Sequence, residues 1–208
     1  MTTSASSKQQ AASSKQQGSV DPPPYPIQLS IGYGWKEHNC EGSRLNPHWD
    51  FLRKEVQPVA KELEERAAKR TSTQHPLRIS LGRLRGRHGT SLMGGIFRRI
   101  ERADVLIFDI SGHNSNVLFE LGYAMAQKGA DSGRIYVFGQ KGIVPADLSG
   151  LMLTYYEVIK KTGGKSEGFA KLEDPRGFRA ALRSTLIEIA QERGMWGLSK
   201  QTVEDEEI

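Results

Sequence analysis

The chain has 208 residues, of which 37% are hydrophobic and 25% charged, and its net charge is +5. This length and composition favour one globular domain with room for tails. No apolar run approaches the roughly 20 residues that span a bilayer, and the N-terminus lacks the apolar core of a signal peptide. We therefore expect a cytoplasmic protein without a membrane partner. The single cysteine, Cys40, excludes an intramolecular disulfide.

Both ends of the chain differ from its middle. Residues 1–24 contain a repeated Ser-Ser-Lys-Gln-Gln segment without any large apolar side chain, followed by Pro-Pro-Pro. Such a segment cannot offset the entropy lost on ordering, so we predict a disordered tail. Residues 198–208 form an acidic tail. The domain is predicted to span residues 25–197.

Strands and helices alternate along this domain. Apolar runs at residues 27–31, 77–81, 105–110, 134–138 and 153–159 are typical of strands. Apolar side chains at helical spacing predict helices from about residue 47, over 91–102, over 115–128 and over 174–193. Pro58 lies inside the first pattern and is expected to kink or split that helix. Strand–helix alternation with right-handed crossovers predicts an α/β, flavodoxin-like three-layer sandwich, whose mostly parallel sheet has about five strands.

The segment from residue 103 to 124 carries the candidate chemistry. A nearly all-apolar strand ends in Asp109, and a turn with Ser111, Gly112 and Asn114 leads into a helix that bears Glu120 in its second turn. Ligands of open α/β sheets bind at the carboxyl ends of strands, beside helix starts. We therefore expect these five residues to line a ligand site.

Glu120 is the candidate catalytic residue. At 100° per residue it lies at the border of its helix's apolar stripe, and Asn116 lies on the same side four residues earlier. Partial desolvation raises the pKa of a carboxyl group and suits it to act as acid, base or nucleophile. The alternative is a surface glutamate that only solvates the edge of the stripe.

Three neighbouring polar residues have two interpretations each. Asp109 could bond a ribose hydroxyl, or it could cap the turn that follows it. Asn114 or Asn116 could be the N-cap of the helix. A cap and a ligand contact are compatible, because the amides of a helix N-terminus also receive anions.

The ends of the first two strands offer further binding groups. Gly32 and Gly34 would let a ligand approach the backbone closely, and Tyr33 between them could stack on a base; a plain turn is the alternative. Arg83, after the second predicted strand, could clamp a phosphate, or it could be a solvated loop residue. No spacing matches a zinc site or a phosphate-binding P-loop, so we expect no metal and no required cofactor.

Positive charge is concentrated between residues 66 and 102. It is either a solvated basic face or an attraction for a polyanion or a phosphorylated small molecule. Nucleic acid is the weaker partner class, because no nucleic-acid-binding motif is recognisable.

Residues 103–110 (ADVLIFDI), 114–117 (NSNV) and 120–124 (ELGYA) resemble the signature of TIR-like nucleotide-binding domains. The wider group includes the nucleoside 2-deoxyribosyltransferase-like proteins. Residues 144–150 (VPADLSG), with Tyr155, are similar to an element that follows the fourth strand of those TIR-like proteins. The resemblance spans roughly residues 27–190.

The resemblance implies chemistry at an N-glycosidic bond. In both groups a glutamate on this helix is central, and it corresponds to Glu120. In deoxyribosyltransferases it attacks the anomeric carbon, and in NAD-cleaving TIR enzymes it engages the nicotinamide-side ribose. The implied function is cleavage of, or transfer from, the N-glycosidic bond of NAD or a related nucleoside or nucleotide. NAD would be a substrate. Assembly as a homo-oligomer and a role in bacterial antiphage defence are further implications.

A second interpretation is a non-catalytic nucleotide-binding module that assembles with partners. In that case Glu120 would bond ribose hydroxyls without chemistry. A third is a nucleic-acid-associated protein that binds through its arginines.

Overall fold

A computed structural model describes residues 25–33, 47–70, 76–84, 92–111, 113–142, 153–159 and 169–196. The two predicted tails, Gly34, Gly112 and the segment 143–152 lie outside these residues.

Strands and helices alternate along the chain as predicted. The strands are β1 (Ile27–Tyr33), β2 (Ile79–Arg83), β3 (Val105–Asp109), β4 (Ile135–Gln140), β5 (Leu153–Ile159) and β6 (Phe169–Leu172). The helices are α1 (Pro47–Arg70), α2 (Leu92–Arg102), α3 (Ser115–Lys128) and α4 (Pro175–Glu192).

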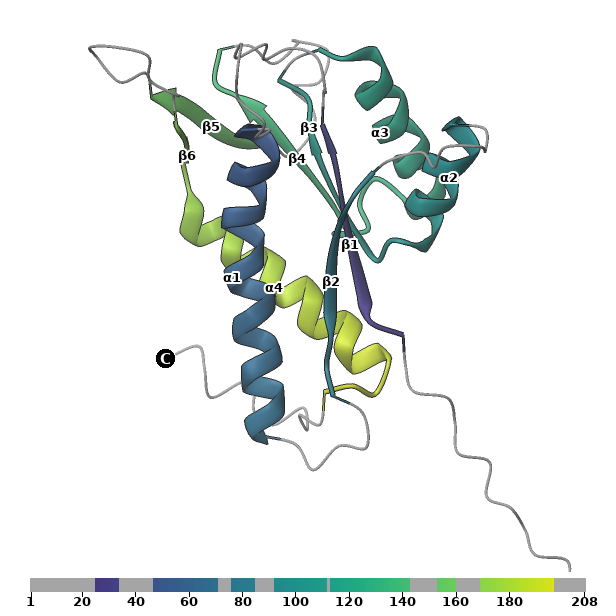
Figure 1. Cartoon of the computed structure of the whole chain (residues 1–208), viewed down its shortest axis with the longest axis vertical. Helices are drawn as coiled ribbons and strands as arrows, with labels where there is room; N and C mark the ends of the chain where they lie inside the picture. The colour runs from purple at the N-terminus through teal and green to yellow at the C-terminus, as the bar shows by residue number, and fades with distance from the viewer. Residues whose placement is uncertain are drawn as a thin grey trace, which may run out of the picture.

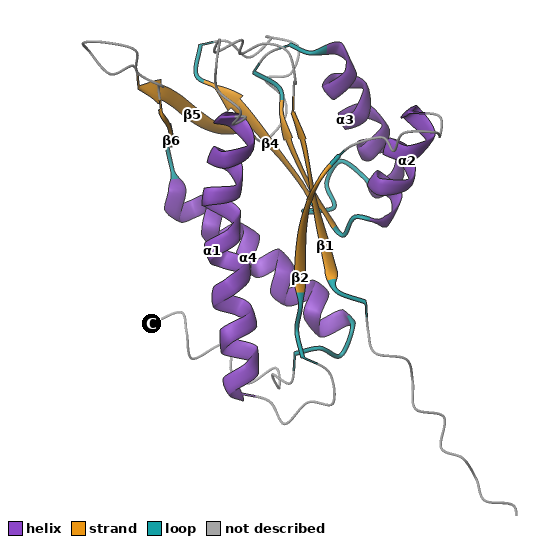
Figure 2. Ribbon diagram, viewed as in Figure 1, coloured by secondary structure: helices purple, strands orange, loops and turns teal. Residues whose placement is uncertain are grey.

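The described strands form one sheet in the order β2-β1-β3-β4-β5-β6. Neighbours from β2 to β5 pair in parallel, and β6 pairs antiparallel with β5. Helices α1 and α4 lie on one face of the sheet and α2 and α3 on the other (Figures 1 and 2). The predicted flavodoxin-like α/β fold is confirmed.

Several boundaries differ from the sequence-based expectation. β2 begins two residues later than predicted and includes Arg83, and β4 continues through Gly139. Pro58 does not split α1, which remains one helix. The apolar side of α1 is buried against the sheet on both sides of Pro58, and this packing outweighs the lost backbone hydrogen bond. The short edge strand β6 was not predicted, because its position depends on pairing with β5.

Two apolar layers enclose the sheet. Alternation along β1 directs Ile27, Leu29 and Ile31 toward α1 and α4, whereas Phe108 of β3 belongs to the layer under α2 and α3. β3 is buried along its whole length because helices cover both of its faces. Most apolar residues expected on the inward sides of the helices are buried, whereas Phe97, Leu118 and Met125 are half-buried. The buried ones are Trp49, Leu52, Val56, Val59, Leu63, Ile96, Ile100, Val117, Leu121, Ala124, Phe178, Leu182, Leu186 and Ile189.

Gly32 packs against side chains, which corrects the expectation that it leaves room for a ligand. A Cβ atom at this position would lie 2.8 Å from Phe108 Cδ1 and 3.1 Å from Leu84 Cδ1. The missing side chain therefore admits Phe108 from the adjacent strand.

Among the described helices, none is both long and apolar enough to cross a membrane.

We expect Gly32→Ala to lower the free energy of unfolding by about 1–3 kcal/mol, because the new methyl group overpacks the Phe108 contact. Gly122→Ala is the control, since a Cβ atom at this helical position meets nothing within 4 Å. It should be neutral or stabilising by up to about 1 kcal/mol. Urea denaturation measures both; equal stabilities would contradict the packing explanation.

Candidate active site

The candidate site lies where the strand order reverses. β1 continues to β2 on one side of the sheet, whereas β3 to β5 extend on the other, so β1 and β3 are the neighbours at the switch point. Their carboxyl ends meet in register, with Tyr33 beside Asp109. In open α/β sheets this point is where ligands bind.

A hydrogen-bond network centred on Asp109 organises this end of the sheet. Asp109 is only 4% exposed. Its Oδ1 accepts from Ser111 N at 3.0 Å and from Ser111 Oγ at 2.7 Å, and its Oδ2 accepts from Tyr156 Oη at 3.0 Å. Ser111 Oγ in turn accepts from Gln140 N at 2.6 Å. The network joins the ends of β3 and β4 to β5, so Asp109 does cap the turn that follows it. Its contact with a ligand stays a prediction.

Tyr156 is a residue that sequence reasoning missed. Burial, and then the Asp109 carboxylate, raise the pKa of the Tyr156 hydroxyl, so it stays protonated and donates. Its ring packs 5.1 Å from that of Phe51 in the core layer under α1. The resemblance pointed to its neighbour Tyr155, which is half-buried. Side chains alternate between the two faces of a strand, so the sequence could have indicated that only one of Tyr155 and Tyr156 faces the core layer under α1.

The turn after Asp109 leads into a capped helix. His113 has a φ of 49°, in the left-handed region that histidine and asparagine enter more readily than most residues. The Oδ1 of Asn114 accepts from Asn116 N at 3.0 Å and Val117 N at 3.4 Å. Asn114 is therefore the N-cap, while Asn116 is exposed.

Glu120 is a buried carboxyl group on α3. It is 7% exposed and lies on the buried side of the helix with Val117, Leu121 and Ala124. Within the described segments, no group donates a hydrogen bond to its carboxyl or forms an ion pair with it. Burial alone raises the pKa of Glu120 to about 7. The burial of Glu120 rules out the alternative of a surface glutamate that only solvates the edge of the stripe.

The predicted binding residues divide between the two faces of the sheet. Tyr33 is buried in the layer under α1, where its ring lies 6.5 Å from that of Trp49. The Arg83 guanidinium carbon lies 4.4 Å from the Trp49 ring centre. The Tyr156 partner of Asp109 is in this same layer. Glu120 projects from α3 on the opposite face. The structure therefore groups Tyr33 and Arg83 around Trp49, and it does not place their side chains beside Glu120.

No protein-family model matches the chain, and no curated protein matches it either. In the described part of the chain, no group of three or more His, Cys, Asp or Glu side chains could hold a metal ion.

We expect Tyr156→Phe to lower the free energy of unfolding by about 1–3 kcal/mol, because it removes a donor from the buried Asp109 carboxylate. Tyr155→Phe removes a hydroxyl from a neighbouring half-buried ring and should change stability by less than about 0.5 kcal/mol. Urea denaturation compares the two. A Tyr156→Phe protein as stable as the wild type would show that the hydrogen bond is dispensable.

The buried Glu120 should make stability fall with rising pH. Between its ordinary pKa of 4.5 and the folded-state value of about 7, the unfolded chain ionises first and the folded state is destabilised relative to it. Below pH 4.5 both states are neutral, and above pH 7 the penalty is constant. Relative to Glu120→Gln, the wild type should lose on the order of 3 kcal/mol across this window, as the difference between pKa values of 4.5 and about 7 requires. Exposed Glu188→Gln is the control; a parallel pH profile for all three proteins would contradict the burial of the charge.

Proposed function

We propose that this protein is an enzyme that breaks the N-glycosidic bond of NAD or of a related nucleoside or nucleotide, with Glu120 as the catalytic carboxylate. One observation carries the proposal. Glu120 is a buried carboxyl group that no described side chain neutralises, on the helix that begins at the carboxyl end of β3. The resemblance of residues 103–124 to TIR-like and deoxyribosyltransferase-like sequences supports the choice of bond.

The chemistry of the bond calls for such a group. When the C–N bond breaks, its electron pair leaves with the base, and positive charge develops on the anomeric carbon and the ring oxygen. A carboxylate next to that carbon stabilises the charge or bonds the carbon as an ester. Water then attacks the carbon and releases its proton, or an acceptor takes the sugar, and Glu120 is regenerated. Exclusion of water strengthens the attraction between carboxylate and cation.

NAD is the favoured substrate on chemical grounds. Its nicotinamide is bonded through a positively charged ring nitrogen, so it leaves as a neutral molecule and needs no proton. A purine base leaves as an anion unless a general acid protonates it. Glu120 alone supplies what the departure of nicotinamide requires.

Neighbouring residues would have two roles: one would contact the sugar, and others would hold the turn before α3 in place. Asn116 lies one helical turn before Glu120, nearer the helix start, and would bond a ribose hydroxyl. Asn114 and the Asp109–Ser111 pair would act as positioning residues, because they fix the turn and the start of α3. Ligand contacts from Tyr33 and Arg83 stay predictions.

Glu120→Gln should strongly reduce turnover, because it removes the negative charge while preserving the shape of the side chain. With NAD as substrate, we expect nicotinamide release, measured by chromatography, to fall at least about a hundredfold, as when a group that stabilises the transition state is removed. In the wild type, kcat/KM should rise about tenfold per pH unit and level off above pH 7, since the ionised carboxylate is the active form. Exposed Glu188→Gln should retain full activity.

The assay runs at several protein concentrations with light scattering, because a homo-oligomer is expected to be the active form. Nucleosides and deoxynucleotides are tested in parallel to identify the substrate. Turnover that survives in Glu120→Gln would remove Glu120 from the mechanism. Binding of NAD without turnover in any assembled state would instead favour the non-catalytic nucleotide-binding module.

A further inference from the structure

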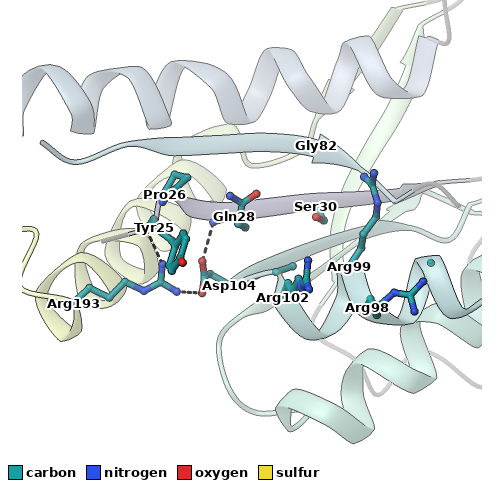
Figure 3. Close-up of a pocket in the computed structure, with 12 residues that line it drawn as sticks. Tyr25, Pro26, Gln28, Ser30, Gly82, Arg98, Arg99, Arg102, Asp104 and Arg193 are labelled. Carbon is teal, nitrogen blue, oxygen red and sulfur yellow. Dashed lines mark hydrogen bonds and ion pairs between the residues drawn. The ribbon is translucent and has the colours of Figure 1, made fainter. Parts of the chain in front are cut away.

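A cavity of about 1190 Å³ lies away from the candidate active site, toward the amino-terminal ends of β1 and β3. Its floor includes Gln28 and Ser30, which alternate with the core residues of β1 and so face the side covered by α2. Arg98, Arg99 and Arg102 of α2 line its wall. Figure 3 shows Arg193 and Asp104 at one end of the cavity, Arg98 and Arg99 at the other, and Arg102 between them.

Asp104, the acidic residue in the lining of this cavity, already has partners within the protein. Asp104 Oδ2 accepts from Gln28 N at 2.8 Å, and its Oδ1 forms an ion pair with Arg193. Arg193 also donates to the carbonyl of Tyr25 at 3.4 Å. This pair ties the starts of β1 and β3 to the end of α4, and its charges cancel. The positive charge of the three α2 arginines is therefore uncompensated by the lining.

The protein itself uses only one of the three α2 arginines, since Arg98 and Arg102 are exposed. Arg98 and Arg102 are four residues apart, so their charges lie on one side of the helix and repel each other. Neither has an ion pair among the described residues. The partial negative charge at the C-terminus of α2 favours Arg99 and Arg102 in its last turn. It does not explain why Arg98 is also an arginine, nor why these side chains line a polar cavity. Arg99 Nη1 donates to the Arg83 carbonyl at 2.9 Å, which holds this guanidinium in place.

The lining matches the chemistry of phosphate. Guanidinium groups bind phosphate oxygens in bidentate fashion. The side-chain amide of Gln28 and the hydroxyl of Ser30 add donors from the floor. A Cβ atom at Gly82 of β2 would meet only Leu29 O, at 3.9 Å, so it would occupy open space. Because Gly82 lines the cavity, the absence of a side chain leaves that space to the cavity. The volume of about 1190 Å³ lies somewhat above the roughly 300–1,000 Å³ that is typical of small-molecule sites.

We propose that this cavity is a second ligand site, which binds a small molecule through a diphosphate held by Arg98, Arg99 and Arg102. Three uncompensated guanidinium charges suit the two or three negative charges of a diphosphate better than the charge of a single phosphate ester. The source is free pyrophosphate or a nucleoside diphosphate. The site uses none of the residues assigned to N-glycosidic chemistry.

Titration calorimetry at about 0.1 M salt tests the site with pyrophosphate, ADP and adenosine. We expect pyrophosphate and ADP to bind with one-to-one stoichiometry and adenosine not to bind. Arg98→Gln and Arg102→Gln should each weaken binding about tenfold, the effect of losing one charge-assisted contact, and the double variant about a hundredfold. Arg176→Gln, at an exposed arginine of α4 outside the cavity, should bind like the wild type. Circular dichroism confirms that each variant is folded.

The comparison of ligands distinguishes free pyrophosphate from a nucleoside diphosphate, and the Glu120→Gln variant distinguishes this cavity from the proposed active site. ADP binding much more tightly than pyrophosphate identifies a nucleotide, and equal affinities identify the bare diphosphate. Glu120→Gln should bind both ligands unchanged, so loss of NAD cleavage and loss of diphosphate binding are distinguishable. No binding of either ligand, or binding that Arg98→Gln and Arg102→Gln leave unchanged, would overturn the proposal. A poly-glutamate peptide that outcompetes pyrophosphate would overturn it in favour of an acidic protein partner.

Discussion

The buried Asp109 carboxylate and its three donors hold the carboxyl end of the sheet together. Two donors come from Ser111 and one from Tyr156, and Ser111 also accepts from the backbone of β4. A buried carboxylate is costly without such partners, and charge-assisted bonds of this kind are the strong ones. Because the turn that starts at Ser111 leads directly into α3, the same network sets where that helix begins and hence the depth of Glu120.

Two acids eleven residues apart therefore have opposite environments. Asp109 receives three hydrogen bonds from Ser111 and Tyr156 within the described segments, and these stabilise the fold. Glu120 is about as deeply buried, yet receives none from the described residues, and burial raises its pKa to about 7. It lies about 8 Å along the helix axis from the first residue of α3. A buried carboxyl without partners lowers stability, and proteins keep such groups chiefly where function uses them.

The two proposed sites occupy different ends of the molecule but share one helical layer. α2 carries the cavity arginines, and α3 carries Glu120. The two helices pack through aromatic rings, with Phe97 stacked 4.1 Å from Tyr123 and 5.9 Å from Phe119. Tyr123 also donates to Glu101 at 2.7 Å. These contacts between α2 and α3 set the position of the arginines relative to Glu120. The sheet separates both from the cluster of Tyr33, Trp49 and Arg83.

Local periodicity was enough to predict the alternating α/β fold, the buried stripes of the helices, the central strand ending in Asp109, and Glu120 as a desolvated carboxyl. These properties depend on residues a few positions apart, and hydrophobic burial enforces them wherever the segment packs. Only the tertiary structure decided that Tyr156, 47 residues away, completes the Asp109 network. It alone showed that Phe108 fills the space at Gly32, that Tyr33 and Glu120 lie on opposite faces, and that three arginines line a cavity with β1. Each of these depends on which strands become neighbours and which face a helix covers, and no local pattern encodes either.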